Sequence, residues 1–112
     1  MNVEDIREYA LSLNDVAESM PFGPDNIVFK IGGKMFLLLA LDADPVQFNV
    51  KCDPEKAIQL REEFKSVLPG YHMNKEHWNT ILVNGELSQE FLESCIATSY
   101  QLVKKKPVKG RK

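Results

Sequence analysis

The stretch IVFKIGGKMFLLLAL, residues 27–41, constrains the fold of this 112-residue chain more than any other part of the sequence. Two runs rich in large apolar residues flank the pair Gly32-Gly33. A connection of two glycines supplies the positive φ angles that a tight hairpin requires. The sequence therefore predicts an antiparallel hairpin made of strands 27–31 and 34–41.

Two further runs have the character of strands. Residues 46–51, VQFNVK, alternate strictly, with Val46, Phe48 and Val50 on one side and polar residues on the other. Such alternation indicates an antiparallel strand with one buried face and one face in water. Residues 79–83, NTILV, are predicted to form a fourth strand.

Three segments carry the signals of helices. Asn2 can cap a first helix, Asp53 followed by Pro54 marks the start of a second, and Ser88 caps a third that runs to about Lys104. The residues expected to face the core are Val3, Ile6, Ala10 and Leu13 in the first helix, Ala57, Leu60, Phe64 and Val67 in the second, and Leu92, Cys95, Ile96, Ser99, Leu102 and Val103 in the third. The predicted order is αβββαβα, in an α+β fold whose helices pack on one face of an antiparallel sheet.

The size and composition of the chain favour one globular domain. With 44% hydrophobic and 27% charged residues, residues 1–104 are expected to form that domain and residues 105–112 a flexible basic tail. The N-terminus is acidic, and no stretch approaches the roughly 20 apolar residues that span a bilayer. Cys52 and Cys95 form no CxxC pair, which favours buried thiols in a reducing cytoplasm over a disulfide. We therefore expect a cytoplasmic monomer that does not associate with membranes.

The net charge of −2 conceals an uneven distribution. The last nine residues, KKKPVKGRK, carry six of the 14 Lys and Arg residues and no acid, which leaves 8 basic against all 16 acidic side chains in residues 1–103. Such an acidic body excludes a protein that coats DNA through its whole surface. The basic tail could attach weakly to any polyanion. Alternatively, its lysines could complement the negative C-terminal pole of the last helix.

Acidic residues are absent from the predicted strands. These strands contain Lys30, Lys34 and Lys51, whereas the predicted helices hold most of the Asp and Glu residues. If the helices cover one face of the sheet, the other face displays Lys30, Lys51, Gln47, Asn49 and Thr80. Amides beside lysines suit phosphates or other anions. A solvated face whose lysines oppose aggregation has the same composition, so both interpretations stand at this point.

Residues 69–80, PGYHMNKEHWNT, concentrate side chains that could carry chemistry. His72 and His77 are five positions apart and have no cysteine or acidic partner at a zinc spacing, so no metal site is predicted. No Ser–His–Asp motif is legible, so we assign no catalytic residue and no cofactor, and favour a protein that is not an enzyme. Trp78 either anchors this loop in the core or stacks bases beside Lys75.

Several ordered blocks resemble the MmcQ/YjbR family of small bacterial proteins. The blocks PFGPDNIVFKIGGKMFLLL, NVKCDPEKAIQLRE, PGYHMNKEHWNTI and SYQLV extend together over about residues 3–104. The resemblance implies a compact α+β fold of the frataxin-like (CyaY-like) type. Members are commonly labelled DNA-binding because their hairpins look like a double-wing motif, a label that rests on fold analogy. The lysine-rich tail lies outside the shared blocks.

The resemblance also implies a binding surface. The basic residues expected to contact the partner are Lys30, Lys34, Lys51, Arg61 and Lys75, and those expected to shape the same surface are His72, His77, Trp78 and Asn79. The leading hypothesis is a small non-enzymatic protein that binds DNA, through the nucleic-acid backbone, with its polar, basic sheet face and wing hairpin. One alternative is a protein-interaction or small-anion-binding domain. Another is a frataxin-like metal binder that uses the acids of the first helix, Glu4, Asp5 and Glu8.

Overall fold

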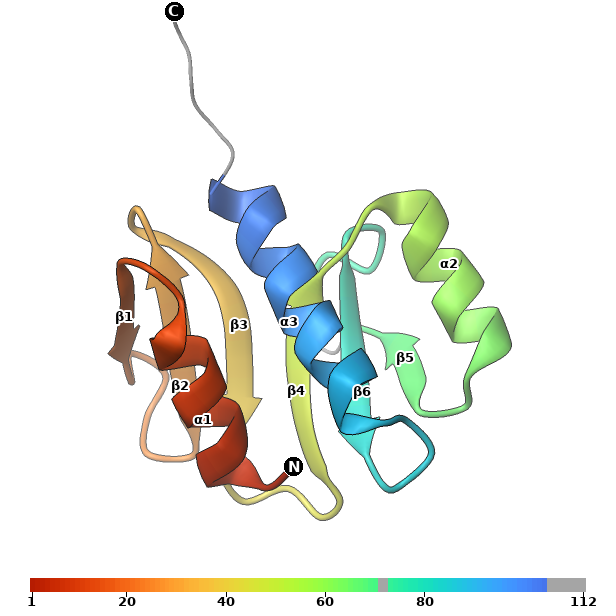
Figure 1. Ribbon diagram of the computed structural model, residues 1–112, viewed down its shortest axis with the longest axis horizontal. Helices are drawn as coiled ribbons and strands as arrows, with labels where there is room; N and C mark the ends of the chain where they lie inside the picture. The colour runs from red at the N-terminus through yellow and green to blue at the C-terminus, as the bar shows by residue number, and fades with distance from the viewer. Residues whose placement is uncertain (71–72, 105–112) are drawn as a thin grey trace, which may run out of the picture.

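The computed structural model describes residues 1–70 and 73–104 (Figure 1). In chain order, the elements are α1 (Val3–Ser12), β1 (Val16–Ser19), β2 (Asn26–Ile31), β3 (Lys34–Ala40), β4 (Val46–Lys51), α2 (Pro54–Glu63), β5 (Val67–Pro69), β6 (Trp78–Val83) and α3 (Gln89–Lys104). The predicted basic tail, residues 105–112, lies outside the described residues.

The strands form one six-stranded antiparallel sheet in the order β1-β2-β3-β4-β6-β5. The helices lie against one face of this sheet: α1 packs on β1, α3 crosses β3 and β4, and α2 lies against β5 and β6 (Figure 1). The predicted α+β class, with helices on one face of an antiparallel sheet, is confirmed. None of the described helices covers the opposite face, so the sheet has a core side and an open side.

The hairpin between β2 and β3 forms where the two glycines predict it. Gly32 and Gly33 have φ angles of 59° and 80°, which only glycine adopts without strain. The turn pairs Ile31 with Lys34, and the register then shifts by one residue at Phe36. This β-bulge decides which side chains of β3 point to which side of the sheet.

The predicted helix starts are found, with one difference in how they are capped. Asn2 and Asp5 form a capping box, in which each side chain accepts a hydrogen bond from the backbone N–H of the other residue. The Ser88 hydroxyl accepts a bond from a backbone N–H in the first turn of α3. Asp53 occupies the cap position of α2 but its side chain makes no capping bond, so the fixed φ of Pro54 and tertiary packing define that start.

Two strands, β1 and β5, are present that the sequence did not predict. β1 follows a turn at Asp15, whose φ is 64°. Val67, predicted in the second helix, belongs instead to β5 and pairs with Ile81, because α2 ends at Glu63. A strand of three residues has little local signal, since its stability comes from the neighbouring strand. The order is therefore αββββαββα rather than αβββαβα.

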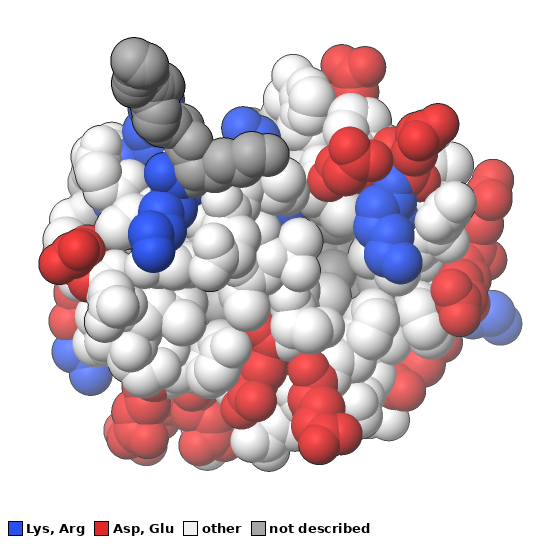
Figure 2. All heavy atoms as spheres, turned by 45° about the horizontal axis from the view of Figure 1, so that its top comes forward, with Lys and Arg blue, Asp and Glu red and all other residues white. Residues whose placement is uncertain are grey.

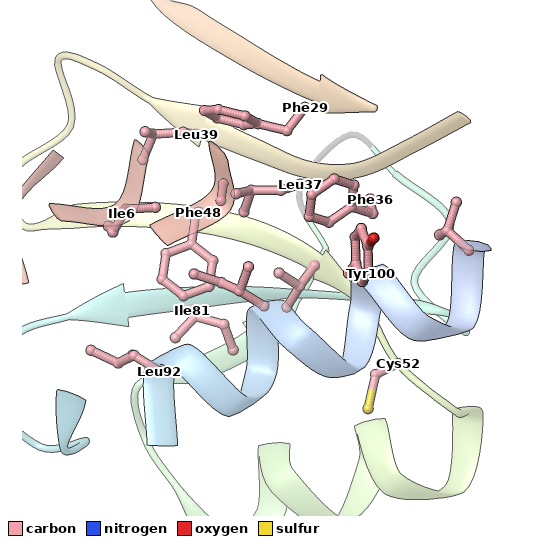
Figure 3. Close-up of a cluster of buried hydrophobic side chains, with 14 of the residues drawn as sticks. Ile6, Phe29, Phe36, Leu37, Leu39, Phe48, Cys52, Ile81, Leu92 and Tyr100 are labelled. Atoms are coloured by element: carbon pink, nitrogen blue, oxygen red, sulfur yellow. The ribbon is translucent and has the colours of Figure 1, made fainter. Parts of the chain in front are cut away.

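The hydrophobic core lies between the sheet and the helices (Figure 3). The sheet contributes Phe29, Leu37, Leu39, Phe48 and Ile81, and the helices add Ile6, Leu92 and Ile96. The ring of Phe36 meets the ring of Tyr100 edge-on, with their centroids 5.4 Å apart. On the predicted inner face of α3, Cys95 and Leu102 are only partly buried. The remaining predicted residues of that face are buried.

The hydroxyl of Ser99, on α3, joins the helix to the sheet where β3 and β4 separate. The last pair of these strands at this end is Leu37–Val50. Ser99 Oγ donates to the carbonyl of Phe36 at 2.5 Å and accepts from the backbone N–H of Lys51 at 2.8 Å. In a continued ladder these two backbone groups would meet each other. The fully buried hydroxyl therefore replaces one rung of the sheet.

Ser99→Ala should lower the free energy of unfolding by about 1–3 kcal/mol, because it leaves a buried carbonyl and a buried N–H without a partner. Urea denaturation followed by circular dichroism measures the change. Thr98→Ala, which alters the adjacent exposed residue of the same helix, is the matched control. Equal stability of the two variants would show that the hydroxyl bridge contributes nothing.

A second polar contact ties the loop before β5 to the turn before α3. The backbone N–H and the hydroxyl of Ser66 donate to Glu86 Oε1 at 2.8 Å and 2.5 Å. Ser66 is buried, whereas Glu86 is exposed. The hydrogen bonds from Ser66 lower the pKa of the Glu86 carboxyl, because they stabilise its charged form.

Glu86→Gln should make the free energy of unfolding depend less on pH in the acidic range. A folded-state pKa below the unfolded value gives a contribution that is complete above about pH 4.3 and is lost as the pH falls through the lower folded pKa. Between about pH 5 and pH 3, the free energy of unfolding should therefore fall more steeply for the wild type than for Glu86→Gln. Urea denaturation at a series of pH values tests this, with Glu62→Gln, at an exposed site on α2, as control. Parallel curves for the wild type and Glu86→Gln would contradict it.

Candidate nucleic-acid interface

Strand register defines the side of the sheet turned away from the helices, which we call the open face. Side chains alternate along a strand and paired residues share a side, so the pairs Lys51–Trp78 and Asn49–Thr80 lie opposite the core. On the four inner strands, the residues of the open face include Val28 and Lys30 of β2, Met35 and Leu38 of β3, Gln47, Asn49 and Lys51 of β4, and Trp78, Thr80 and Leu82 of β6. All five polar residues predicted to share this face do share it.

The charges on the two sides of the sheet are segregated. Lys30 and Lys51 form no ion pair with a described residue. Glu18 of β1 is the only acidic residue of the described strands, and it pairs opposite the core residue Phe29. On that side, its carboxylate accepts a hydrogen bond from Nε of Arg7, a residue of α1, at 2.8 Å. The open face therefore presents cations without an acid from any described strand.

Apolar side chains occupy the centre of the open face, which the sequence pattern did not predict. Val28 is 1% exposed, and Leu38 beside it is half-buried. Asn49 and Thr80 are also buried, and Thr80 Oγ1 donates to Asn49 Oδ1 at 2.5 Å. The accessible polar groups of this face are consequently at its margins, where the lysines and Gln47 are only partly buried.

Trp78 contacts the backbone at Gly70 but lies on the open face rather than in the core. Its backbone carbonyl accepts a hydrogen bond from the N–H of Gly70 at 2.8 Å, and a Cβ at position 70 would lie 2.8 Å from Trp78 Cβ. Glycine at position 70 is thus required by the close approach of the two chains. The indole itself is half-buried and neighbours Lys51 across the strands, so it packs on the sheet while keeping part of its ring accessible.

The turn before β6 carries the next group of predicted residues. The backbone N–H groups of His77 and Trp78 donate to the carbonyl of Asn74, which closes the turn and leaves Lys75 exposed. His77 Nε2 lies 3.7 Å from Glu76 Oε1, and both side chains reach solvent. His72 lies outside the described residues.

Three predicted residues do not belong to the open face. Lys34 pairs with Ile31, whose side chain faces the core, and lines a hollow with Lys104 at the end of α3. Arg61 lies on α2, where its Nε donates to a carbonyl of its own helix at 3.2 Å. Asn79 pairs with Val50 on the core side and is 1% exposed. The set that the structure brings together is therefore Lys30, Lys51 and Trp78, with Lys75 and His77 in the adjoining turn.

The surface on the helix side has a different character. In a view tilted by 45° from that of Figure 1, acidic side chains gather along the lower and right-hand parts of the molecule, while lysines and arginines lie at the upper left and singly beside the acids (Figure 2). The carboxylate of Asp5, considered above as a metal ligand, is held by the backbone of Asn2 in the capping box. Within residues 1–70 and 73–104, no group of three or more His, Cys, Asp or Glu side chains could hold a metal ion. None of the helices in these ranges is long and apolar enough to cross a membrane.

Comparison with known proteins identifies the relatives of this chain. Residues 11–102 match the YjbR family. The uncharacterized protein YbdF of Escherichia coli O157:H7 is 40% identical over 100 residues, which cover 89% of this chain and 82% of that protein. A crystal structure of a Deinococcus radiodurans protein of the DUF419 domain family superposes with a TM-score of 0.90 at 35% identity, covering 96% of this chain and 82% of that chain. A Pseudomonas syringae protein superposes with a TM-score of 0.80 at 32% identity, covering 92% and 99%.

Proposed function

This chain belongs to the YjbR family, and from the geometry of its open face we propose that it is a small, non-enzymatic protein that binds nucleic-acid backbone there. Lys30 and Lys51 contact phosphates, and Lys75 extends the cationic margin from the turn beside Trp78. The segregation of charge carries this proposal: the open face has lysines and no acid from a described strand, while Glu18 faces the helices.

A single strand fits this face better than a duplex. Single-stranded nucleic acids bind where cationic groups follow the backbone and aromatic side chains stack bases. Trp78 lies directly across the strands from Lys51, so one base and its phosphate can be held together. The wing hairpin, formed by β2 and β3, takes part through Lys30 alone, because Lys34 is on the other side of the sheet.

Binding should weaken with salt in proportion to the number of phosphates neutralised. If about three lysines each neutralise one phosphate, log affinity should fall against log salt concentration with a slope near −2.1 for a single strand and near −2.7 for a duplex. Lys30→Ala/Lys51→Ala should reduce the single-strand slope to about −0.7. Fluorescence anisotropy of a labelled oligothymidylate across salt concentrations measures these slopes.

The double variant Lys34→Ala/Lys104→Ala is the matched control, since it removes the same charge from the helix side of the sheet. We expect it to bind as the wild type does. A chain that ends at Lys104 separates the open face from the basic tail. If only this truncation abolished binding, or if both double variants lost affinity equally, the proposed interface would be wrong.

Trp78 should report directly on a bound strand. It is the only tryptophan, so a base stacked on it should quench the intrinsic fluorescence of the protein. Trp78→Ala should lower affinity for oligothymidylate by about 5- to 150-fold, the equivalent of 1–3 kcal/mol for a stacked base. The variant keeps the Cβ that packs against Gly70, so circular dichroism should show an intact fold. Unchanged emission at saturating oligothymidylate would exclude stacking on Trp78.

A further inference from the structure

A cavity of about 70 Å³ lies on the core side of the sheet, between α2 and α3. The sheet lines it with Val50, Asn79 and Ile81, and the helices line it with Leu60, Phe91 and Cys95. Cys52, between β4 and α2, also lines the cavity, and its sulfur is directed toward the space between these two helices (Figure 3). Lys56, Ser94 and Thr98 are exposed and form the mouth. Lys51 also contributes to the lining, although its side chain belongs to the open face, so the cavity adjoins the proposed nucleic-acid interface at this residue.

Asn79, one of the lining residues, has a buried side-chain atom without a hydrogen-bond partner. Asn79 is 1% exposed, and its Oδ1 bonds to no described atom. Its Nδ2 donates to the carbonyl of Ala57 at 3.4 Å. Because that carbonyl can only accept, the orientation of the amide is fixed, with Oδ1 as the unsatisfied acceptor. A buried acceptor without a donor destabilises a fold, so its presence calls for an explanation.

Apart from Asn79, Lys51 and the polar residues of the mouth, the lining consists of apolar side chains and the two thiols. Burial raises the pKa of Cys95 to about 12, and the neighbouring Cys52 adds to the effect. Burial also raises the pKa of Cys52, with a further contribution from Asp53. Both thiols are therefore neutral and behave as small hydrophobic groups.

The mouth of the cavity, by contrast, is cationic. Lys56 is exposed at the mouth, and its charge acts on both Cys52 and Cys95, in each case favouring the thiolate. A ligand that enters between the helices therefore meets a positive charge first, apolar walls next and a hydrogen-bond acceptor last.

We propose that this cavity binds a small organic anion whose apolar body carries one O–H or N–H donor at the end opposite its charge. The donor bonds to Asn79 Oδ1, the apolar body lies against Leu60 and Phe91, and the anionic group remains at the mouth beside Lys56. A volume of 70 Å³ is about half of the 150 Å³ that encloses benzene. The donor end is thus enclosed, while the rest of the ligand lies in the mouth between α2 and α3.

Two probes of the same shape and charge test this assignment: para-hydroxybenzoate carries a donor where para-methylbenzoate carries a methyl group. In a titration followed by NMR, both should shift the backbone resonances of Leu60 and Cys95, and only the hydroxyl probe should shift the side-chain amide of Asn79. The hydroxyl probe should bind about fivefold more tightly, the ratio that one net hydrogen bond gives. In Asn79→Leu, which has a similar shape but no acceptor, this preference should disappear or reverse. Lys56→Gln should weaken both probes and preserve their ratio.

Three results would overturn the proposal: no shift at Leu60 and Cys95 with either probe, equal affinities in the wild type, or a preference that survives in Asn79→Leu. Should Asn79→Leu fail to fold, Cys95→Leu replaces it, because a larger side chain on α3 fills the cavity from the partly exposed side. That variant should lose at least tenfold in affinity for both probes. Retained affinity in Cys95→Leu would place the binding elsewhere and overturn the proposal equally.

Discussion

The buried hydroxyl of Ser99 fixes the helical layer to the sheet, and both candidate surfaces depend on its position. It holds α3 over the point where β3 and β4 separate, by bonding to the carbonyl of Phe36 and to the N–H of Lys51. The side chain of Lys51 consequently remains on the open face while its backbone is held from the core side. Cys95, one helical turn before Ser99, is directed on the same side of α3 toward the cavity. Ser99 thus sets the position of Lys51, on the open face, relative to Cys95, in the wall of the cavity.

The segregation of charge has two origins, and only one of them points to function. Acids in the first turns of the helices stabilise the positive helix pole, so Glu4, Glu55 and Glu90 have a structural reason for their place. That reason does not explain why Lys30 and Lys51 stand without acids around an apolar centre. The centre of this face is already buried, so the case for a binding surface rests on the partly exposed lysines at its margins.

Local chemistry in the sequence was sufficient for the hairpin, the helix starts and the fold class, because two glycines, a capping box and strict alternation each act over a few residues. It was insufficient for β3, since MFLLLAL contains no polar residue to mark a side, and the bulge at Phe36 then places Lys34 toward the helices. Asn79 was assigned to the surface of Trp78, although adjacent residues of a strand point to opposite sides. Continuing the alternation through Ile81 would have placed Asn79 in the core. Arg61 was predicted at the binding surface from the family resemblance alone, because no sequence pattern indicated which way its side chain points from the helix.

The two surfaces share strands and adjoin at Lys51, but β6 separates the side chains of Trp78 and Asn79. Trp78 and Asn79 are consecutive residues of β6 that face opposite sides, and the six residues of β6 are paired with β4 along its whole length. Coupling between sites requires an element with two arrangements that both ligands bias. Because every residue of β6 is paired with β4, this strand has one arrangement and is not such a two-state element. Lys30 is on β2, which β3 and β4 separate from β6, and it does not line the cavity. Substitutions at Lys30 and at Asn79 should therefore act additively, because each changes one side of the sheet and leaves its hydrogen bonds intact.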